Sequence, residues 1–393
     1  MCCDGMVVRS TEGPAPLAAV VIGAGQAGLS ASYHLQRLGL DHVVLDADAA
    51  PGGAWQHRWD SLTMDDVHGV ADLPGAPAPG RGPERANEVI PAWFGDYERT
   101  HHLPVIRPVR VDRVESVGDL LLVRAGLRSW RTRTVVNATG TWSRPFVPFY
   151  PGQETFRGEQ LHSVDFPGPE HFRGKRTLVV GGGASAVQLL GEIRPVTDTL
   201  WVTRSEPVWR DRIEEFDGRA AIALVAERVR RGLPPSSVVS VTGIGLRAQE
   251  QEAARLGAYE RRPMFARIEP GGVRWADGSF EPVDVVLWAT GFRPAVGHLG
   301  PLGLKSPHGG IRLLTSTSDV QSATTAAVDP RVQLVGYGPS ASTIGGNRGG
   351  RAAATAVRRW VRAANERPDT VPQARSTLSI DLPLASSSTS LSR

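Results

Sequence analysis

Short, mainly apolar runs alternate along this chain with longer stretches in which apolar residues recur at helical spacing. Glycine or polar residues bound the runs, as expected of strands that a parallel sheet buries on both faces. The runs lie at residues 18–22, 43–45, 135–136, 178–180, 200–202, 285–288 and 332–335. Helical spacing follows the first run, recurs between residues 213 and 259, and returns after residue 343. This alternation predicts an α/β protein.

The first apolar run leads into the glycine-rich turn Gly23-x-Gly25-x-x-Gly28. In a dinucleotide-binding turn the first glycine permits the sharp bend, the second lets the backbone approach a pyrophosphate, and the third lets helix and strand pack closely. The following helix would present N–H groups to the phosphates. Asp46 ends the next strand, 18 residues after Gly28. A carboxylate at that spacing can accept a hydrogen bond from a ribose hydroxyl.

A second copy of the same pattern follows the run at 178–180. Its turn reads Gly181-x-Gly183-x-x-Ala186, and Arg204 lies 18 residues after Ala186. An acid at this place would repel a 2′-phosphate, whereas a guanidinium can bind one through charge-assisted hydrogen bonds. The second site is therefore predicted to select NADPH. Arg210, six residues further along, could assist.

Two strands end in the same three residues. They are Ala138-Thr139-Gly140 and Ala289-Thr290-Gly291, and they bracket the second glycine-rich turn. We interpret them as crossovers between two domains. The prediction is therefore two Rossmann-like dinucleotide-binding domains, with the second inserted into the first. The first domain would comprise residues 1–150 and 284–393, and the second residues 151–283 with a helical insertion near 213–259.

Composition excludes several classes of function. The 44 basic and 40 acidic residues leave an excess of only 4, which gives no case for a nucleic-acid partner. Cys2 and Cys3 are the only cysteines, which argues against a dithiol centre and a zinc site. His101-His102 lacks further ligands at metal spacing, so no metal is expected. No apolar run is long enough for a membrane span, and we expect a cytoplasmic protein.

Two further motifs point to a family. One is Gly52-Gly53-x-Trp55, and the other is "FRGEQLHSVDF", which gives Phe156-x-Gly158-x-x-x-His162-x-x-x-Phe166. With the two glycine-rich turns, the two Ala-Thr-Gly strands and Arg204, the chain resembles the class B flavoprotein monooxygenases. That family includes flavin-containing monooxygenases and Baeyer–Villiger monooxygenases. The likeness spans roughly residues 17–362.

The resemblance implies FAD at the first site, NADPH at the second, and O2 and a small organic molecule as substrates. It implies that NADPH reduces the flavin, that a C4a-(hydro)peroxyflavin forms, and that one oxygen atom is transferred. Oxygenation of nitrogen or sulfur is favoured. Baeyer–Villiger oxygenation of a ketone and an NADPH oxidase or flavin reductase remain as alternatives, and a non-enzymatic nucleotide sensor is a distant one. The substrate is not predicted, and a homo-oligomer is left open.

The resemblance also nominates site residues. Asp65 and Asp66 are candidates for tuning the flavin adduct, with a loop turn or a helix cap as an equal alternative. Baeyer–Villiger enzymes commonly use an Asp in this region to orient an active-site arginine, and the sequence identifies no such arginine. His162 is a candidate for coupling domain motion to NADPH binding, although a structural histidine is favoured. Asn347, with Arg348 beside it, is a candidate contact to flavin or substrate, with helix capping as the alternative.

The remaining expected cofactor contacts comprise the glycine-rich turns and the strand ends beside them. At the first site they are Gly23, Gly25, Gln26, Ala27, Gly28, Asp46, Gly53, Trp55, Arg58, Ala138, Thr139, Gly140, Thr343 and Ile344. At the second site they are Gly181, Gly183, Ala184, Ser185, Ala186, Arg204, Ala289, Thr290 and Gly291. The insertion at 213–259 is expected to shape a substrate channel.

Overall fold

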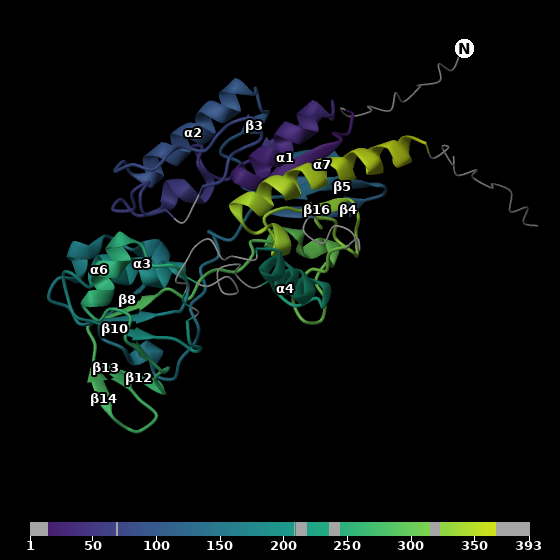
Figure 1. Cartoon of the computed structure of the whole chain (residues 1–393). Helices are drawn as coiled ribbons and strands as arrows, with labels where there is room; N and C mark the ends of the chain where they lie inside the picture. The colour runs from purple at the N-terminus through teal and green to yellow at the C-terminus, as the bar shows by residue number, and fades with distance from the viewer. Residues whose placement is uncertain are drawn as a thin grey trace, which may run out of the picture.

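The computed structural model describes residues 15–67, 70–207, 209, 218–235, 244–314 and 323–366. Cys2, Cys3 and Arg210 lie outside these ranges, as do the side chains of Thr343 and Ile344. The chain forms two α/β lobes, as predicted, and each lobe is built on its own five-stranded parallel sheet (Figure 1). None of the described helices is sufficiently long and apolar to cross a membrane.

The first lobe has three layers. Its central sheet has the strand order β16 (Val332–Leu334), β7 (Val135–Asn137), β1 (Ala19–Ile22), β2 (His42–Leu45) and β3 (Val105–Ile106). One layer is helical and contains α1 (Gln26–Arg37) and α7 (Thr343–Asn365), which lie side by side (Figure 1), and α2 (Ala86–Thr100). The other is an antiparallel sheet of β4 (Arg113–Val117), β5 (Leu120–Ala125) and β6 (Arg128–Thr132).

The alternation of side chains along the central strands explains why both faces of this sheet are apolar. Val21 packs with Leu29 and the other residues of the helical layer. Val20 and Ile22 point to the opposite face and pack with residues of the antiparallel sheet. Because successive side chains of a strand alternate between faces, a strand covered on both sides must be apolar throughout.

The second lobe repeats this plan. Its sheet has the strand order β11 (Arg261–Arg262), β10 (Thr199–Val202), β9 (Thr177–Val180), β15 (Val285–Trp288) and β8 (Glu159–His162). Helices α3 (Ala184–Ile193) and α6 (Ala248–Arg255) pack against each other on one side. A small antiparallel sheet covers the other face of the parallel sheet. It consists of β12 (Arg267–Glu269), β13 (Gly272–Arg274) and β14 (Phe280–Pro282).

The strand pairing corrects the predicted domain boundary at residue 284. β15 lies between β8 and β9 in the second sheet, so residues 285–288 belong to the second domain. Tyr150 stacks on Trp288 and also belongs there. The chain crosses between lobes at residues 141–147 and returns at 292–296. The two crossings run side by side, because Phe146 N–H donates to Gly291 O at 2.9 Å and Arg293 N–H donates to Arg144 O at 2.9 Å.

The helical insertion is divided between the two lobes, which corrects its assignment to the NADPH domain alone. Helix α4 (Gly218–Arg230) lies below the first lobe (Figure 1). Its Val229 is buried in the core of that lobe, against Gly338. The backbone after the helix is fixed there too, because Gly310 N–H donates to Gly232 O at 3.0 Å. In contrast, α6 packs on α3 of the second lobe.

Candidate cofactor and substrate site

The first glycine-rich turn contains two glycines that the protein's own packing requires and one that it does not. A Cβ at Gly23, whose φ is +98°, would lie 2.7 Å from Ala138 O. A Cβ at Gly28 would lie 1.9 Å from Gly23 O. A Cβ at Gly25 would meet no protein atom within 4 Å. The open face at Gly25 is therefore free for a ligand, which is the role of the second glycine in a pyrophosphate-binding turn.

The Gly52-Gly53 turn closes onto this same loop. Gly53 has a φ of +51°, and a Cβ there would lie 2.9 Å from Gly25 Cα. The turn opens a short helical segment, η1 (Gly53–His57), which carries Trp55. The backbones of two segments that are distant in sequence therefore meet at the first glycine-rich turn, where the cofactor is expected to bind. We call this place the cofactor cradle.

Two amide side chains beside the turn retain buried acceptors without donors. Gln26 donates to Ala71 O at 2.7 Å, and Asn347 donates to Asp72 O. The other atoms of these amides, Gln26 Oε1 and Asn347 Oδ1, are buried and have no hydrogen-bond partner in the described part of the chain. A buried acceptor without a donor is costly. The hydroxyl groups of a bound FAD would supply such donors, so these residues fit that cofactor.

Asp46 lies at the end of β2 as predicted, but it is part of a buried charge cluster. Arg107 Nε donates to Asp46 Oδ2 at 2.9 Å, and the two η-nitrogens of Arg107 bind Glu98 at 2.6 Å. Burial raises the pKa of Asp46, and the Arg107 charge opposes that rise. The sequence analysis missed Arg107 and Glu98, because nothing in their spacing from Asp46 marks them as partners.

The second glycine-rich turn repeats the construction of the first. Gly181 has a φ of +142°, and a Cβ there would lie 2.2 Å from Ala289 O. A Cβ at Gly183 would meet nothing within 4 Å. Each Ala-Thr-Gly segment thus places its alanine carbonyl against the first glycine of its own domain. Ala186 takes the third position, and Ala184 and Ser185 begin α3.

Arg204 follows β10 and is exposed. It has no hydrogen bond or ion pair with any residue that the structure describes. Arg261, on the adjacent strand β11, donates to Thr203 Oγ1 at 2.8 Å and forms an ion pair with Glu206 at 2.5 Å. The sheet edge at which the sequence predicts a 2′-phosphate contact therefore carries a second arginine, which sequence analysis missed.

His162 lies at the return crossing between the lobes. Its Nδ1 accepts a hydrogen bond from Val164 N–H at 3.2 Å, so its Nε2 carries the proton that is donated to Gly291 O at 3.1 Å. The ring also meets Phe292 edge to face. Burial lowers the pKa of His162. These contacts match the structural alternative and place the side chain at the crossing.

Asp65 and Asp66 lie in a loop of the first lobe that docks on the second. Asp66 Oδ2 accepts a hydrogen bond from Thr63 Oγ1 at 2.6 Å, which is a local turn contact, and Asp65 is exposed. Gln188 on α3 donates to Asp66 O at 2.9 Å. Neither carboxylate forms an ion pair with an arginine among the described residues.

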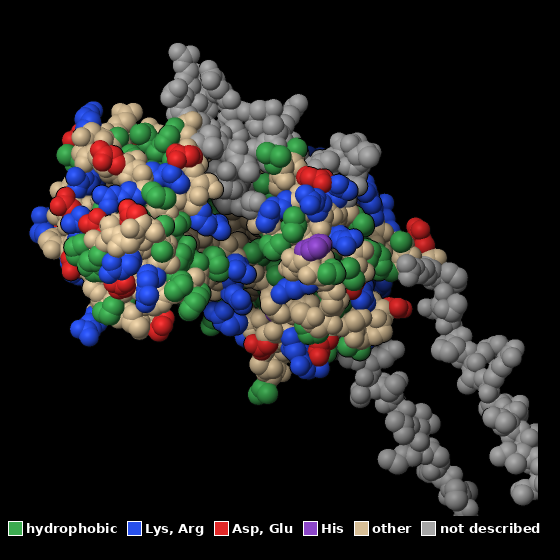
Figure 2. All heavy atoms as spheres, turned by 90° about the horizontal axis from the view of Figure 1, so that it is seen from below, with side chains coloured by type: hydrophobic (Ala, Val, Ile, Leu, Met, Phe, Trp, Pro, Cys, Tyr) green, Lys and Arg blue, Asp and Glu red, His purple; other side chains and the backbone are tan. Residues whose placement is uncertain are grey.

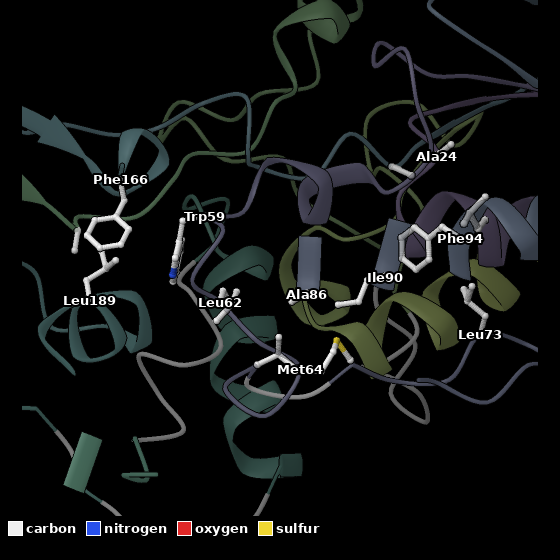
Figure 3. Packing of buried hydrophobic residues seen from close by; sticks show 14 of the residues in the cluster. Ala24, Trp59, Leu62, Met64, Leu73, Ala86, Ile90, Phe94, Phe166 and Leu189 are labelled. Carbon is white, nitrogen blue, oxygen red and sulfur yellow. The ribbon is translucent and has the colours of Figure 1, made fainter. Parts of the chain in front are cut away.

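A cavity of about 540 Å³ opens between the two lobes. Its walls come from residues 57–61 and Arg85 of the first lobe and from Val164 and residues 166–168 of the second. Residues of the two glycine-rich turns, Asp65, Asp66 and His162 do not line it. Figure 3 shows Trp59 at this junction, across from Phe166 and Leu189. Sequence analysis missed Trp59 as a cavity residue.

Glu192 of α3 holds this cavity wall in place. Trp59 Nε1 donates to Glu192 Oε1 at 2.7 Å, and Ser61 Oγ donates to Glu192 Oε2. The carboxyl group thereby connects the second lobe to two cavity residues of the first. Burial raises the pKa of Glu192.

The face of the molecule shown in Figure 2 provides no strong charge signal. On the face shown in Figure 2, basic and acidic side chains are interspersed over both lobes. In contrast, burial shifts the pKa values of Asp46, Glu192 and the cavity arginine Arg58.

Comparison with known proteins identifies the family. The family model for pyridine nucleotide-disulphide oxidoreductases matches residues 20–217. A solved flavin-containing monooxygenase from Stenotrophomonas maltophilia is 39% identical, with 89% of this chain and 99% of that one covered and a TM-score of 0.74. This protein belongs to the flavin-dependent monooxygenases. It is accordingly an oxidoreductase.

Two curated relatives indicate how diverse this family is. A Baeyer–Villiger monooxygenase of Streptomyces coelicolor is 30% identical over 65% of this chain and 51% of its own length. Senecionine N-oxygenase of Tyria jacobaeae is 27% identical over 46% of this chain and 45% of its own length. The cofactors of the family are FAD and NADPH. The unobstructed backbone at Gly25 and Gly183, the unpartnered amide oxygens of Gln26 and Asn347, and Arg204 fit these cofactors. The individual roles of the site residues remain predictions.

Proposed function

We propose that this flavin-dependent monooxygenase uses NADPH and O2 to transfer one oxygen atom to the nitrogen or sulfur of a small organic substrate. The observation that carries the proposal is the 540 Å³ cavity between the two nucleotide-binding lobes. Its volume falls within the range of small-molecule sites. In the overall reaction, substrate, O2, NADPH and a proton give the oxygenated substrate, water and NADP⁺.

Bound FAD would supply the redox chemistry, and the chain's own residues position and shield the reactants. The open backbone at Gly25, with the acceptors of Gln26 and Asn347, holds FAD. Gly183 and Arg204 hold NADPH. Trp59 and Phe166 contribute apolar parts of the cavity wall.

Oxygenation of nitrogen or sulfur is favoured over Baeyer–Villiger chemistry by one observation. In Baeyer–Villiger enzymes the resemblance implies an Asp that orients an active-site arginine. Here Asp66 accepts a hydrogen bond from Thr63, and no described arginine lies within ion-pair distance of Asp65 or Asp66. Arg247 lies nearby and donates to Val67 O at 2.5 Å. Burial lowers the pKa of Arg247, and the Asp66 charge is one of those that oppose this change, but the two side chains form no ion pair. The two curated relatives carry names from both classes, so they do not decide between them.

A competition between substrates tests this proposal. Purified protein with FAD and NADPH would receive methyl para-tolyl sulfide and phenylacetone together, and the products would be separated by mass spectrometry. The proposal predicts the sulfoxide as the main product. Predominant benzyl acetate would assign the Baeyer–Villiger reaction instead. NADPH consumption with hydrogen peroxide as the sole product would assign an oxidase.

A further inference from the structure

We propose that the cavity recognises a substrate that carries a carboxylate, and that Arg58 binds this anion. The inference rests on the proposed oxygenase function for the identity of the cavity, and it adds the substrate class. It is carried by the surroundings of Arg58, the other charges of the cavity and the chemistry of its walls.

The side chain of Arg58 is half-buried, and its guanidinium has no counter-ion among the described residues. Its Nε is buried and has no acceptor, and it forms no ion pair with any described residue. Burial alone lowers the pKa of Arg58 to about 10, so the group remains charged at neutral pH. A charge that is partly withdrawn from water and has no partner is unfavourable in a folded protein. An anion in the cavity that Arg58 lines would supply the missing counter-charge.

Aromatic rings hold this guanidinium in place. Its central carbon lies 4.6 Å from the ring centroid of Trp142, 5.5 Å from that of Trp55 and 5.9 Å from that of Trp59. Cation–π contacts stabilise a positive charge without neutralising it. The cage therefore orients Arg58 and leaves its η-nitrogens without an acidic partner among the described residues.

The other cations on the cavity wall already have carboxylate partners. His57 Nε2 lies 3.2 Å from Asp48, and Arg85 lies 3.6 Å from Asp60 and 3.5 Å from Glu88. Asp60, the acid of the cavity wall, also accepts a hydrogen bond from Asn87. Among the described cavity residues, Arg58 is thus the cation without an acidic partner.

The position of Arg58 favours a substrate anion over a cofactor phosphate. The glycine-rich turns that fit the phosphates of FAD and NADPH contribute no residue to the cavity. A guanidinium also matches a carboxylate in planar, bidentate geometry. Trp59 and Phe166 line the same space and suit an apolar or aromatic body. The substrate class is therefore an apolar carboxylic acid with an oxidisable amine or sulfide.

The test compares two probes that differ in charge, para-methylthiobenzoate and methyl para-tolyl sulfide. Their dissociation constants would be measured by calorimetry on the FAD-loaded protein saturated with NADP⁺. Wild type should bind the acid at least about tenfold more tightly than the neutral sulfide, because a charged hydrogen bond in a buried site is worth more than the methyl group that it replaces. Equal or weaker binding of the acid would overturn the proposal without any variant.

Variants assign the effect to Arg58. Arg58→Met should weaken acid binding about 30-fold, which is about 2 kcal/mol, and change binding of the neutral sulfide less than about threefold. Arg58→Lys keeps the charge but loses the bidentate geometry, so the loss should be intermediate. Arg85→Met is the matched control, because it removes a paired cation from the same wall, and it should leave the acid-to-sulfide ratio within about threefold.

Two other results would assign Arg58 differently. If Arg58→Lys and Arg58→Met lose FAD or bind NADP⁺ more weakly while the preference for the acid persists, Arg58 serves a cofactor and the proposal is wrong. If the Arg58 variants bind the acid and the neutral sulfide with equally weakened affinity, Arg58 shapes the cavity without binding an anion, and the proposal is wrong. Failure of the proposed oxygenase function would look different from failure of this proposal. The acid would still bind tightly and depend on Arg58, but no sulfoxide would form.

Discussion

The substitution of alanine for Gly25 separates what the fold requires from what the cofactor requires. Gly25 has a φ of −75°, which any residue adopts, and a Cβ there would meet no protein atom within 4 Å. Gly28 provides the comparison, because its added Cβ would lie 1.9 Å from Gly23 O. Gly25→Ala should therefore damage FAD binding alone, and Gly28→Ala should damage the protein itself.

The structure sets the expected magnitudes. Gly25 is the N-cap of α1, so alanine there costs about 0.5–1 kcal/mol of helix stability, and the smaller entropy of the unfolded chain returns about 0.4–1 kcal/mol. The free energy of unfolding without FAD should thus change by less than about 0.5 kcal/mol. In the cofactor cradle the same methyl group should cost about 1–3 kcal/mol of strain, which weakens FAD binding about 5- to 150-fold.

Gly28→Ala has a different balance. Alanine gains up to about 1 kcal/mol in helix propensity. The overlap at 1.9 Å with a backbone oxygen nevertheless forces α1 away from β1. Overpacking against a rigid backbone costs about 1–3 kcal/mol or more, so this variant should be less stable even without FAD.

The assay is thermal unfolding of wild type and both variants with and without added FAD, together with FAD titration. Wild type should gain thermal stability on adding FAD, since a ligand that binds the native state stabilises it. Gly25→Ala should match wild type without FAD and show a reduced gain. The reasoning would be refuted if Gly25→Ala bound FAD as wild type does, or if Gly28→Ala unfolded as wild type does without FAD.

Three further predictions concern charged residues. Arg204→Ala should raise the KM for NADPH about tenfold in steady-state assays, while the KM for NADH changes less than about twofold. Equal changes in the two KM values would show that Arg204 does not bind the 2′-phosphate. Burial raises the pKa of Glu192 by penalising its ionised form, although the hydrogen bonds from Ser61 and Trp59 oppose the rise. The free energy of unfolding should therefore fall as pH rises through the raised pKa. Denaturant unfolding from about pH 5 to 8 should show a smaller pH dependence for Glu192→Gln than for wild type, and identical slopes would contradict this. Arg107→Met should destabilise the protein by about 3–5 kcal/mol, because it leaves Asp46 and Glu98 buried without their cation; a melting temperature equal to that of wild type would show that the cluster is not a stabilising unit.

The elements that the sequence predicted well are local ones. Both glycine-rich turns, and the strand and helix that flank each, follow from spacing within about twenty residues, as in the dinucleotide fingerprint. The boundary at 284 was wrong because β15 enters its sheet between two strands that precede it by more than a hundred residues. An apolar strand matches either sheet equally well, and pattern alone does not choose its partners.

The site was predictable to the same extent. The dinucleotide fingerprint indicates which glycines leave room for a ligand and which are packed against the protein's own backbone. In contrast, the ion pairs of Arg107 with Asp46 and Glu98 form only when the chain folds. The cage around Arg58 likewise combines Trp55 and Trp59 with Trp142 from the crossing segment. Asp66 was nominated by resemblance, and the structure gives it a turn contact with Thr63. Long-range contacts of this kind leave no spacing signal in a single sequence.

The fate of oxygen tests the central claim most directly. The FAD-loaded protein would be supplied with NADPH, para-methylthiobenzoate and isotopically labelled O2, and the labelled sulfoxide, NADPH consumption and hydrogen peroxide would be measured together. The account predicts one labelled oxygen atom in the product for each NADPH consumed, with little peroxide. NADPH consumption that yields peroxide and no labelled product, from this acid and from methyl para-tolyl sulfide alike, would contradict it.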